Sequence, residues 1–97
     1  MRAYELLFIV NPTIEDELRD STMQRIDSAI TSQGGQIDNI NNWGRRKLAY
    51  EIDKMSDGDY TLIDFHAEPA SIEEINRVLR ITDAIKRFKI VARTDRD

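Results

Sequence analysis

The stretch RAYELLFIV, residues 2–10, decides how the rest of the chain can fold. Successive side chains of a strand point to opposite faces of a sheet, and here both faces are rich in apolar residues. A strand with apolar side chains on both faces is typical of the middle of a sheet rather than its edge. One face carries Tyr4, Leu6, Phe8 and Val10, and the other carries Ala3, Glu5, Leu7 and Ile9.

The segment after this strand predicts a helix. Asn11-Pro12 ends the strand, because proline has no N–H to donate to a neighbouring strand. Thr13, with Asp16 three residues later, resembles a helix N-terminus, and acidic residues fill the first turn, where the helix dipole favours them. Gly34-Gly35 supplies a left-handed C-terminal stop. The residues at helical spacing that we expect to face the sheet are Leu18, Thr22, Met23, Ile26, Ala29 and Ile30.

Two further strands are expected to form a hairpin. Residues 36–42 and 46–53 carry strand signals on either side of Trp43-Gly44, where the glycine suggests a bulge or bend. Ser56-Asp57-Gly58-Asp59 has the composition of a hairpin turn, so the returning strand is predicted over residues 60–67.

The last part of the chain repeats the helix–strand order. Pro69 breaks the preceding strand, and Ser71 with Glu74 resembles a capping box at the start of a second helix. A final strand is predicted over residues 87–93. The order βαββαβ is that of the ferredoxin-like α+β fold, a four-stranded antiparallel sheet with two helices on one face. We expect residues 1–97 to form one such domain, with a second-helix stripe of Ile72, Ile75, Val78 and Leu79.

The two faces of the predicted sheet differ in how they are covered. The helices cover the face that carries Leu6, Phe8, Val10, Ile63, Phe65, Phe88 and Ile90. We expect no element of this chain to cover the opposite face, and an uncovered apolar patch usually marks a partner. Scattered surface hydrophobes are the alternative interpretation. The candidate partner-binding residues are Leu7, Ile9, Tyr60, Leu62 and Val91.

The charge of the chain is unevenly distributed. The net charge is −4, but residues 43–54 sum to +2 and residues 76–97 sum to +4, whereas the remaining segments are acidic. A polyanion responds to the local field, because charges beyond a Debye length of about 8 Å are screened. The two basic stretches therefore favour either phosphate binding or two ordinary solvated faces.

Enzymatic and metal-binding functions find little support in the sequence. The chain has no cysteine, and its one histidine, His66, has no second metal ligand beside it in sequence. No GxGxxG, P-loop or nucleophile elbow is present. We therefore expect no enzymatic activity, no cofactor, no metal and no small-molecule substrate.

Membrane insertion and export are also not expected. The longest apolar run, Leu6 to Val10, is far shorter than the roughly 20 residues of a membrane span. Met1-Arg2 leads into it without the pattern of a signal peptide. We therefore expect a soluble cytoplasmic protein.

The RNA recognition motif has the same element order and stacks bases on aromatic side chains of its open sheet face. The corresponding positions here are Leu7 and Ile9 on the first strand, and Tyr60, Leu62 and their neighbours on the third. Tyr60 alone is too little for a base-stacking platform. The open face is therefore expected to bind protein rather than bases.

Four segments together resemble the bacterial ribosomal protein S6 family. They are MRAYE at 1–5, NP at 11–12, WGRRKLAYEI at 43–52 and LRITDAIKRFKIV at 79–91, so the resemblance spans the chain. It implies a ferredoxin-like domain that binds the central domain of small-subunit ribosomal RNA. It also implies pairing with ribosomal protein S18 during subunit assembly, and a role in translation.

The matching positions supply candidate RNA contacts. One sequence departure is Glu51, which stands where the family commonly has proline, and a carboxylate there makes a phosphate contact at this position unlikely. Lys86 and Lys89 are added to the candidate set on charge alone. The contacts implied by the resemblance are Arg2, Tyr4, Arg45, Arg46, Lys47, Arg80 and Arg87.

Two other functions compete with this one. A small-molecule regulatory module could use the same fold and dimerise through its open sheet face, although no glycine-rich loop joins the first strand to the first helix. A small enzyme is the third possibility, and it lacks any nucleophile–base arrangement.

Overall fold

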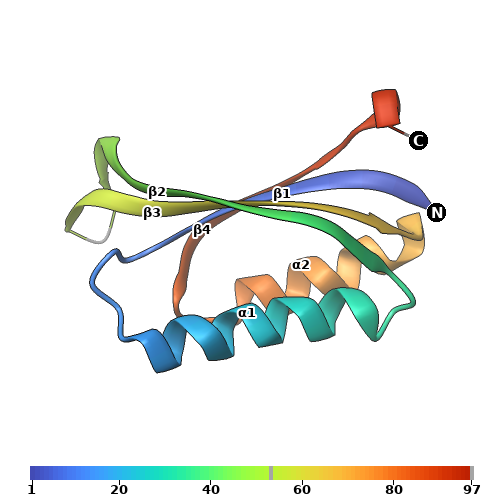
Figure 1. Ribbon diagram of the computed structural model, residues 1–97, viewed down its shortest axis with the longest axis horizontal. Helices are drawn as coiled ribbons and strands as arrows, with labels where there is room; N and C mark the ends of the chain where they lie inside the picture. The colour runs from blue at the N-terminus through green and yellow to red at the C-terminus, as the bar shows by residue number, and fades with distance from the viewer. Residues whose placement is uncertain (53, 97) are drawn as a thin grey trace.

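The computed structural model describes residues 1–52 and 54–96 and confirms the βαββαβ order. Asp53, which the sequence analysis placed in strand 46–53, and Asp97 lie outside that description. Figure 1 shows the sheet with both helices on one side of it. The elements are β1 (Arg2–Val10), α1 (Asp16–Thr31), β2 (Gln36–Ile52), β3 (Met55–Ala67), α2 (Ile72–Arg80) and β4 (Ile85–Ala92).

The sheet is antiparallel throughout, with the strand order β2-β3-β1-β4. β1 lies between β3 and β4, as its two apolar faces predicted. Leu6 lies opposite Ile63 on one side and Ile90 on the other. This row places three apolar side chains under the helices.

The space between the sheet and the helices forms the main core. Leu6, Ile63 and Phe65 from the sheet are fully buried, and so are Ile30 of α1 and Ile75 of α2. All seven residues assigned to this face pack in the main core, so that prediction is confirmed. The structure adds Tyr4 and Ala67, with Ile14, Ile37 and Ile85 packed against them. Of the predicted stripe of the second helix, Ile72, Ile75 and Leu79 pack in this core, whereas Val78 is not among its residues.

The predicted stripe of α1 is correct except at its start. Thr22, Ile26 and Ile30 are buried, but 47% of the Leu18 surface is exposed. The helix begins only at Asp16, so Leu18 lies in its first turn, before the part of the helix that covers the sheet.

The cap predicted at Thr13 is wrong, because α1 has Glu15 at its N-cap. Ser71 does occupy the predicted N-cap position of α2, but without a capping hydrogen bond, and the glycine stop is confirmed. The hydroxyl and backbone N–H of Thr13 both donate to Oδ1 of Asn11, so this side chain closes a turn before the helix. Ser71 makes no side-chain cap to α2, because a short 3-10 turn over Pro69–Ser71 leads into that helix. Gly34 has a φ of 81° in the turn that follows α1, and its N–H donates to the carbonyl of Thr31, the last residue of the helix.

The hairpin turn lies elsewhere than predicted. Ile52 pairs with Met55, so β2 and β3 connect there, and the predicted turn over residues 56–59 lies within β3. Gly58 serves packing instead: a β-carbon at this position would lie 2.5 Å from Cγ2 of Ile9. The glycine therefore lets the hairpin approach β1 closely.

β2 is one continuous strand rather than two. The bulge expected near Gly44 is confirmed, because the register with β3 shifts between Asn42 and Gly44, and Gly44 has a φ of 80°. Two further register shifts lie between Ile37 and Asn39 and between Lys47 and Ile52. Bulges bend a strand, and β2 is bent accordingly.

The tip of the β2–β3 hairpin bends away from the helices, which is visible at the left of Figure 1. This brings Leu48, Ile52 and Met55 against Ile9, with Tyr60 packed beside them. We call Leu48, Ile52 and Met55 the satellite core. The expectation that no element covers the open face is thus wrong at this end, because the chain's own hairpin covers Ile9.

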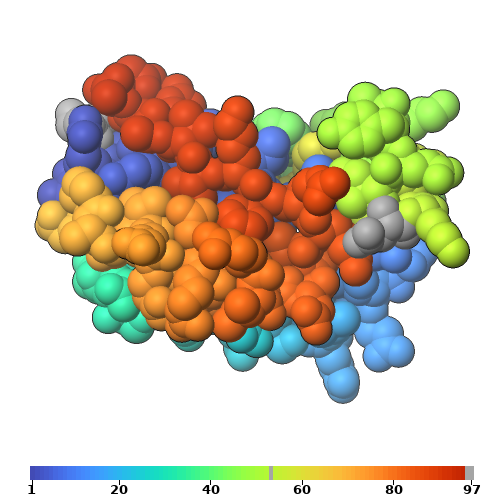
Figure 2. Space-filling view, turned by 180° about the vertical axis from the view of Figure 1, so that it is seen from behind, coloured from blue at the N-terminus to red at the C-terminus, as the bar shows by residue number. Residues whose placement is uncertain are grey.

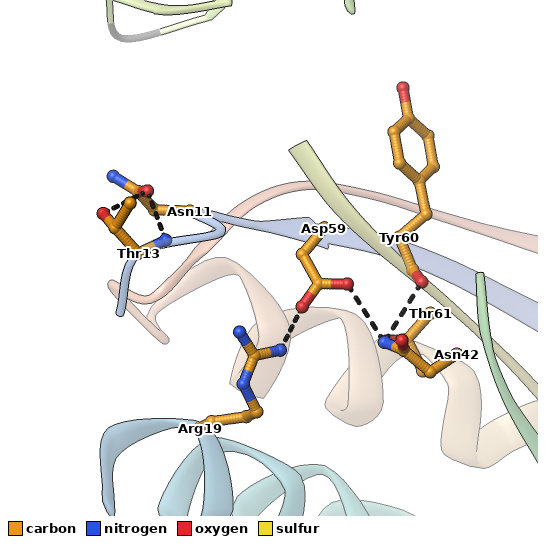
Figure 3. Close-up of polar contacts among 7 residues, drawn as sticks. All are labelled: Asn11, Thr13, Arg19, Asn42, Asp59, Tyr60 and Thr61. Carbon is orange, nitrogen blue, oxygen red and sulfur yellow. Dashed lines mark hydrogen bonds and ion pairs between the residues drawn. The ribbon is translucent and has the colours of Figure 1, made fainter. Parts of the chain in front are cut away.

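A polar network ties α1 to the sheet edge (Figure 3). Asp59 is 7% exposed, and its Oδ2 pairs with the guanidinium of Arg19. Nδ2 of Asn42 donates to Oδ1 of Asp59 and to Oγ1 of Thr61, at 3.0 Å in each case. The buried carboxylate is therefore both charge-paired and hydrogen-bonded, as burial requires.

Candidate nucleic-acid interface

The sheet register brings the two basic stretches to one end of the molecule. Arg45 lies opposite Asp59, Asp59 lies opposite Val10, and Val10 lies opposite Ile85. These four residues form one row across the sheet, from β2 to the start of β4. The run Arg45–Lys47 therefore lies at the same end as the first residues of β4.

The register of β4 with β1 also shows where the basic residues of β4 lie. Arg87 lies opposite Ile9 and Lys89 opposite Leu7, so both belong to the open face. Arg80 ends α2, just before β4 begins, and Lys86 precedes Arg87. Figure 2 shows hairpin atoms (yellow-green) and the start of β4 (orange) at the same end of the molecule.

The three basic residues of the β2 run differ in their partners. Nε of Arg45 donates to Oδ2 of Asp57 at 2.8 Å, so that charge is compensated within the hairpin. Arg46 and Lys47 are exposed, and neither forms an ion pair within residues 1–52 and 54–96. Arg46 and Lys47 therefore contribute most of the outward positive field of this run.

Arg2 and Tyr4 lie apart from this group. Arg2 is opposite Ala67, at the other end of β1 from Ile9, which corresponds to about 24 Å along the strand. Tyr4 is only 8% exposed and its ring stacks on Phe65 with a centroid distance of 5.5 Å. The structure assigns this ring to the main core, so we leave Tyr4 out of the interface.

Two other arginines are compensated by neighbouring carboxylates. Arg77 forms a two-bond pair with Glu74, at 2.6 and 2.7 Å, which raises the pKa of Arg77 and lowers that of Glu74. Arg93 pairs with Asp95 and Glu5, and the hydrogen bonds that Arg93 donates to Asp95 are the main cause of its raised pKa. These two arginines therefore contribute little to the basic end of the sheet.

The candidate partner-binding residues divide into two sets. Leu7 and Leu62 lie opposite each other and are partly exposed, and Val91 is exposed on β4. Ile9 is 9% exposed because the satellite core covers it. Leu7, Leu62 and Val91 form what we call the open-face patch, and Ile9 supports it from within the protein. Tyr60, the remaining candidate, contacts an aromatic neighbour.

That neighbour is Trp43, which the sequence analysis treated only as part of a bend. Its ring stacks on Tyr60 with a centroid distance of 6.1 Å and an interplanar angle of 14°. Arg46 lies beside them, and the three side chains line a shallow hollow. The glycine after Trp43 was the available signal, because it marks a bulge, and a bulge leaves one residue of the strand unpaired.

Other parts of the structure give less support for a functional site. A hollow of about 420 Å³ lies between α1 and the β2–β3 edge, next to the Arg19–Asp59 pair, but both oxygens of that carboxylate already have partners. His66 pairs with Asp38 through Nδ1 at 2.5 Å. Within the described ranges no three potential metal ligands cluster together, and no helix is long and apolar enough to cross a membrane.

Comparisons with known proteins agree on one family. The sequence profile of ribosomal protein S6 matches residues 3–92. The small ribosomal subunit protein bS6 of Clostridium novyi is 46% identical over 91 residues, which cover 94% of this chain and 96% of that protein. The bS6 protein of Micrococcus luteus is 41% identical, over 94% of this chain and 90% of the relative.

Solved structures give the same result. The crystal structure of 30S ribosomal protein S6 from Thermotoga maritima superposes with a TM-score of 0.89 at 36% identity, covering 97% of this chain and 89% of that one. The C-terminal domain of the MgtC protein from Mycobacterium tuberculosis, at 17% identity and a TM-score of 0.55, shares the fold alone. The sequence and structural comparisons together show that this chain belongs to the ribosomal protein S6 family.

Proposed function

We propose that this protein is a structural constituent of the bacterial small ribosomal subunit, in the cytoplasm. In this proposal it binds the central domain of small-subunit ribosomal RNA together with S18 and thereby supports subunit assembly and translation. Its relatives are named as small ribosomal subunit proteins, which supports the ribosomal assignment. The protein acts as a scaffold and performs no catalysis.

The observation that carries the RNA-binding part is the convergence of basic residues at one end of the sheet. Arg46 and Lys47 on β2 share this end with Arg87 on β4, although they lie 41 and 40 positions before it in sequence. A guanidinium donates two hydrogen bonds to a phosphate from one planar group. A local cationic surface of this kind can bind RNA even when the net charge is −4.

The remaining basic candidates surround this centre. Lys89 extends the group along the open face of β4, while Arg80 and Lys86 lie where α2 leads into β4. Arg45 contributes less, because Asp57 already accepts its hydrogen bond. Arg2 would form a separate contact at the opposite end of β1.

The protein partner is proposed to pack on the open-face patch. Leu7 and Leu62 are neighbours across two strands, and Val91 extends the patch on β4. Partly exposed apolar side chains in one area favour a protein contact over solvent. S18 is the proposed partner, and Ile9 beneath the satellite core keeps the surface rigid.

The RNA-binding proposal can be tested by charge reversal in the presence of S18. A central-domain RNA fragment would be titrated with wild-type protein, Arg46→Glu and Arg87→Glu at several salt concentrations. Each neutralised phosphate contributes about −0.7 to −0.9 to the slope of log K against log salt. We expect each variant to weaken binding and to make that slope shallower by about 1.

Arg25→Glu is the matched control, because Arg25 is an exposed arginine of α1, outside the basic end. It should bind with the wild-type slope. Equal losses of RNA affinity in all three variants would mean that binding depends only on the total charge of the protein. The assignment of the RNA interface to the basic end of the sheet would then be wrong. Recovery of tagged protein from sucrose gradients solely as a free dimer would contradict the ribosomal role itself.

A further inference from the structure

The bulge in β2 leaves Trp43 without a paired residue on β3. Asn42 lies opposite Thr61 and Gly44 lies opposite Tyr60, so Trp43 is the extra residue between two paired positions. The Asn42 side chain points to the helix side, where it bonds to Asp59. Trp43 instead lies beside Tyr60 on the open face.

The two rings form an aromatic surface that remains accessible. They are nearly parallel, at 14°, and 40% of the Trp43 surface is exposed. The hollow that they line with Arg46 is open and shallow. A flat ring could therefore be added to this stack without displacing any part of the protein.

The aromatic pair rests on rigid support. Tyr60 packs against the satellite core, whose members Leu48 and Ile52 come from the same hairpin as Trp43. Gly58 allows this close packing, because Ile9 and Leu48 occupy the space that a side chain would need. A preorganised surface loses little conformational entropy when a ligand binds.

The charges around the pair favour an anionic ligand. Arg46 lines the hollow itself, and the row that contains Tyr60 continues through Ile9 to Arg87 on β4. Two acidic side chains of the hairpin are already paired, Asp57 with Arg45 and Asp59 with Arg19. Aromatic side chains flanked by cations are the usual platform for single-stranded nucleic acid.

We propose that Trp43 and Tyr60 stack an unpaired base of the bound RNA, while Arg46 binds the adjacent phosphate. This inference rests on the proposed function and names a specific contact within it. It revises the expectation that the open face has too few aromatics, and it moves Tyr60 from the partner-binding set to the RNA-binding set. A cationic side chain of a protein is a poorer occupant, because Arg46 and Arg87 would repel it.

Trp43 is the only tryptophan of the chain, so its fluorescence reports directly on this contact. Wild-type protein would be titrated with a short single-stranded RNA and with the central-domain fragment, while fluorescence and binding are followed together. We expect quenching that saturates at the same RNA concentration as binding does. Stacking on a base contributes about 1–3 kcal/mol, so Trp43→Leu should weaken binding by about tenfold, whereas Trp43→Phe should retain most of the affinity.

Tyr50→Ala is the matched control, since Tyr50 is another aromatic residue of β2 and is 71% exposed. It should bind like the wild type, and urea unfolding of every variant separates lost contacts from lost stability. Normal binding by Trp43→Leu, with unquenched wild-type fluorescence, would overturn the stacking contact and leave the proposed function standing. A Trp43 signal that responds to S18 without RNA would assign the hollow to the protein partner instead. No RNA binding by any protein, with or without S18, would overturn both proposals.

Discussion

The main core and the satellite core lie on opposite faces of the same sheet, yet they are built in different ways. The main core combines alternating strand residues such as Leu6 and Phe65 with helical stripes, and its central side chains are fully buried. The satellite core comes from one hairpin that bends over Ile9, and its members retain a small exposed fraction. The main core follows from the local periodicity of strands and helices. The satellite core depends on the position of the turn between β2 and β3.

The largest expected effect tests the main core. Phe65→Ala would remove a fully buried ring that stacks on Tyr4. Loss of a buried phenylalanine costs about 3–5 kcal/mol, because the cavity cannot collapse fully. Urea unfolding should show this loss. Ile52→Ala in the satellite core should cost clearly less, and equal losses would mean that the two cores do not differ in packing.

Gly58→Ala tests the close approach of the hairpin to β1. The added methyl group would overlap Cγ2 of Ile9, and overpacking of this kind costs about 1–3 kcal/mol. The same substitution combined with Ile9→Ala should cost less than the sum of the two single changes, as measured by urea unfolding. Strict additivity would show that the glycine does not serve this contact.

A gain in stability is expected at Lys54, which has a φ of 66° beside the hairpin connection. A left-handed backbone costs a non-glycine residue about 1–2 kcal/mol, and part of this is regained when glycine is introduced. Lys54→Gly should therefore raise the thermal midpoint by a few degrees. Since it also removes a charge, Lys54→Gln is the control, and an equal rise there would assign the effect to charge.

The smallest effect concerns the exposed pair of Glu74 and Arg77 on α2. Hydrogen bonds from Arg77 lower the pKa of Glu74 below its ordinary value of 4.5. The contribution of the pair is therefore present above that value and disappears as the pH falls through the lowered pKa. Glu74→Gln should lower the thermal midpoint slightly at pH 7, and this difference should disappear as the pH falls through the lowered pKa. A pH-independent difference would mean that ionisation of Glu74 is not involved.

Much of the fold follows from the residues alone, because alternation and helical spacing are local properties. They identified β1 as the central strand and Gly44 as the site of a bulge. The turn was misplaced because Asp57-Gly58 has turn chemistry, while the glycine is needed for contact with Ile9. Such a contact joins residues far apart in sequence, so local patterns do not reveal it.

The candidate RNA-binding site was predicted only in part, because it also depends on contacts between residues far apart in sequence. Charge segregation identified both basic stretches, but only the strand register shows that Arg46 and Arg87 share one end of the sheet. Trp43 was missed because simple alternation does not account for an extra residue in a bulge. Tyr4 was assigned to RNA by the family motif, and its stacking on Phe65 became visible only in three dimensions.

The central position of β1 has a consequence for how the protein is made. β1 is synthesised before both of its partners, β3 and β4, and β4 is the last of the four strands in sequence. The most apolar strand therefore waits until the other three strands have been made before its second edge is paired. Exposed strand edges aggregate readily, so the nascent chain is vulnerable until β4 is complete, and pairing of that strand protects it.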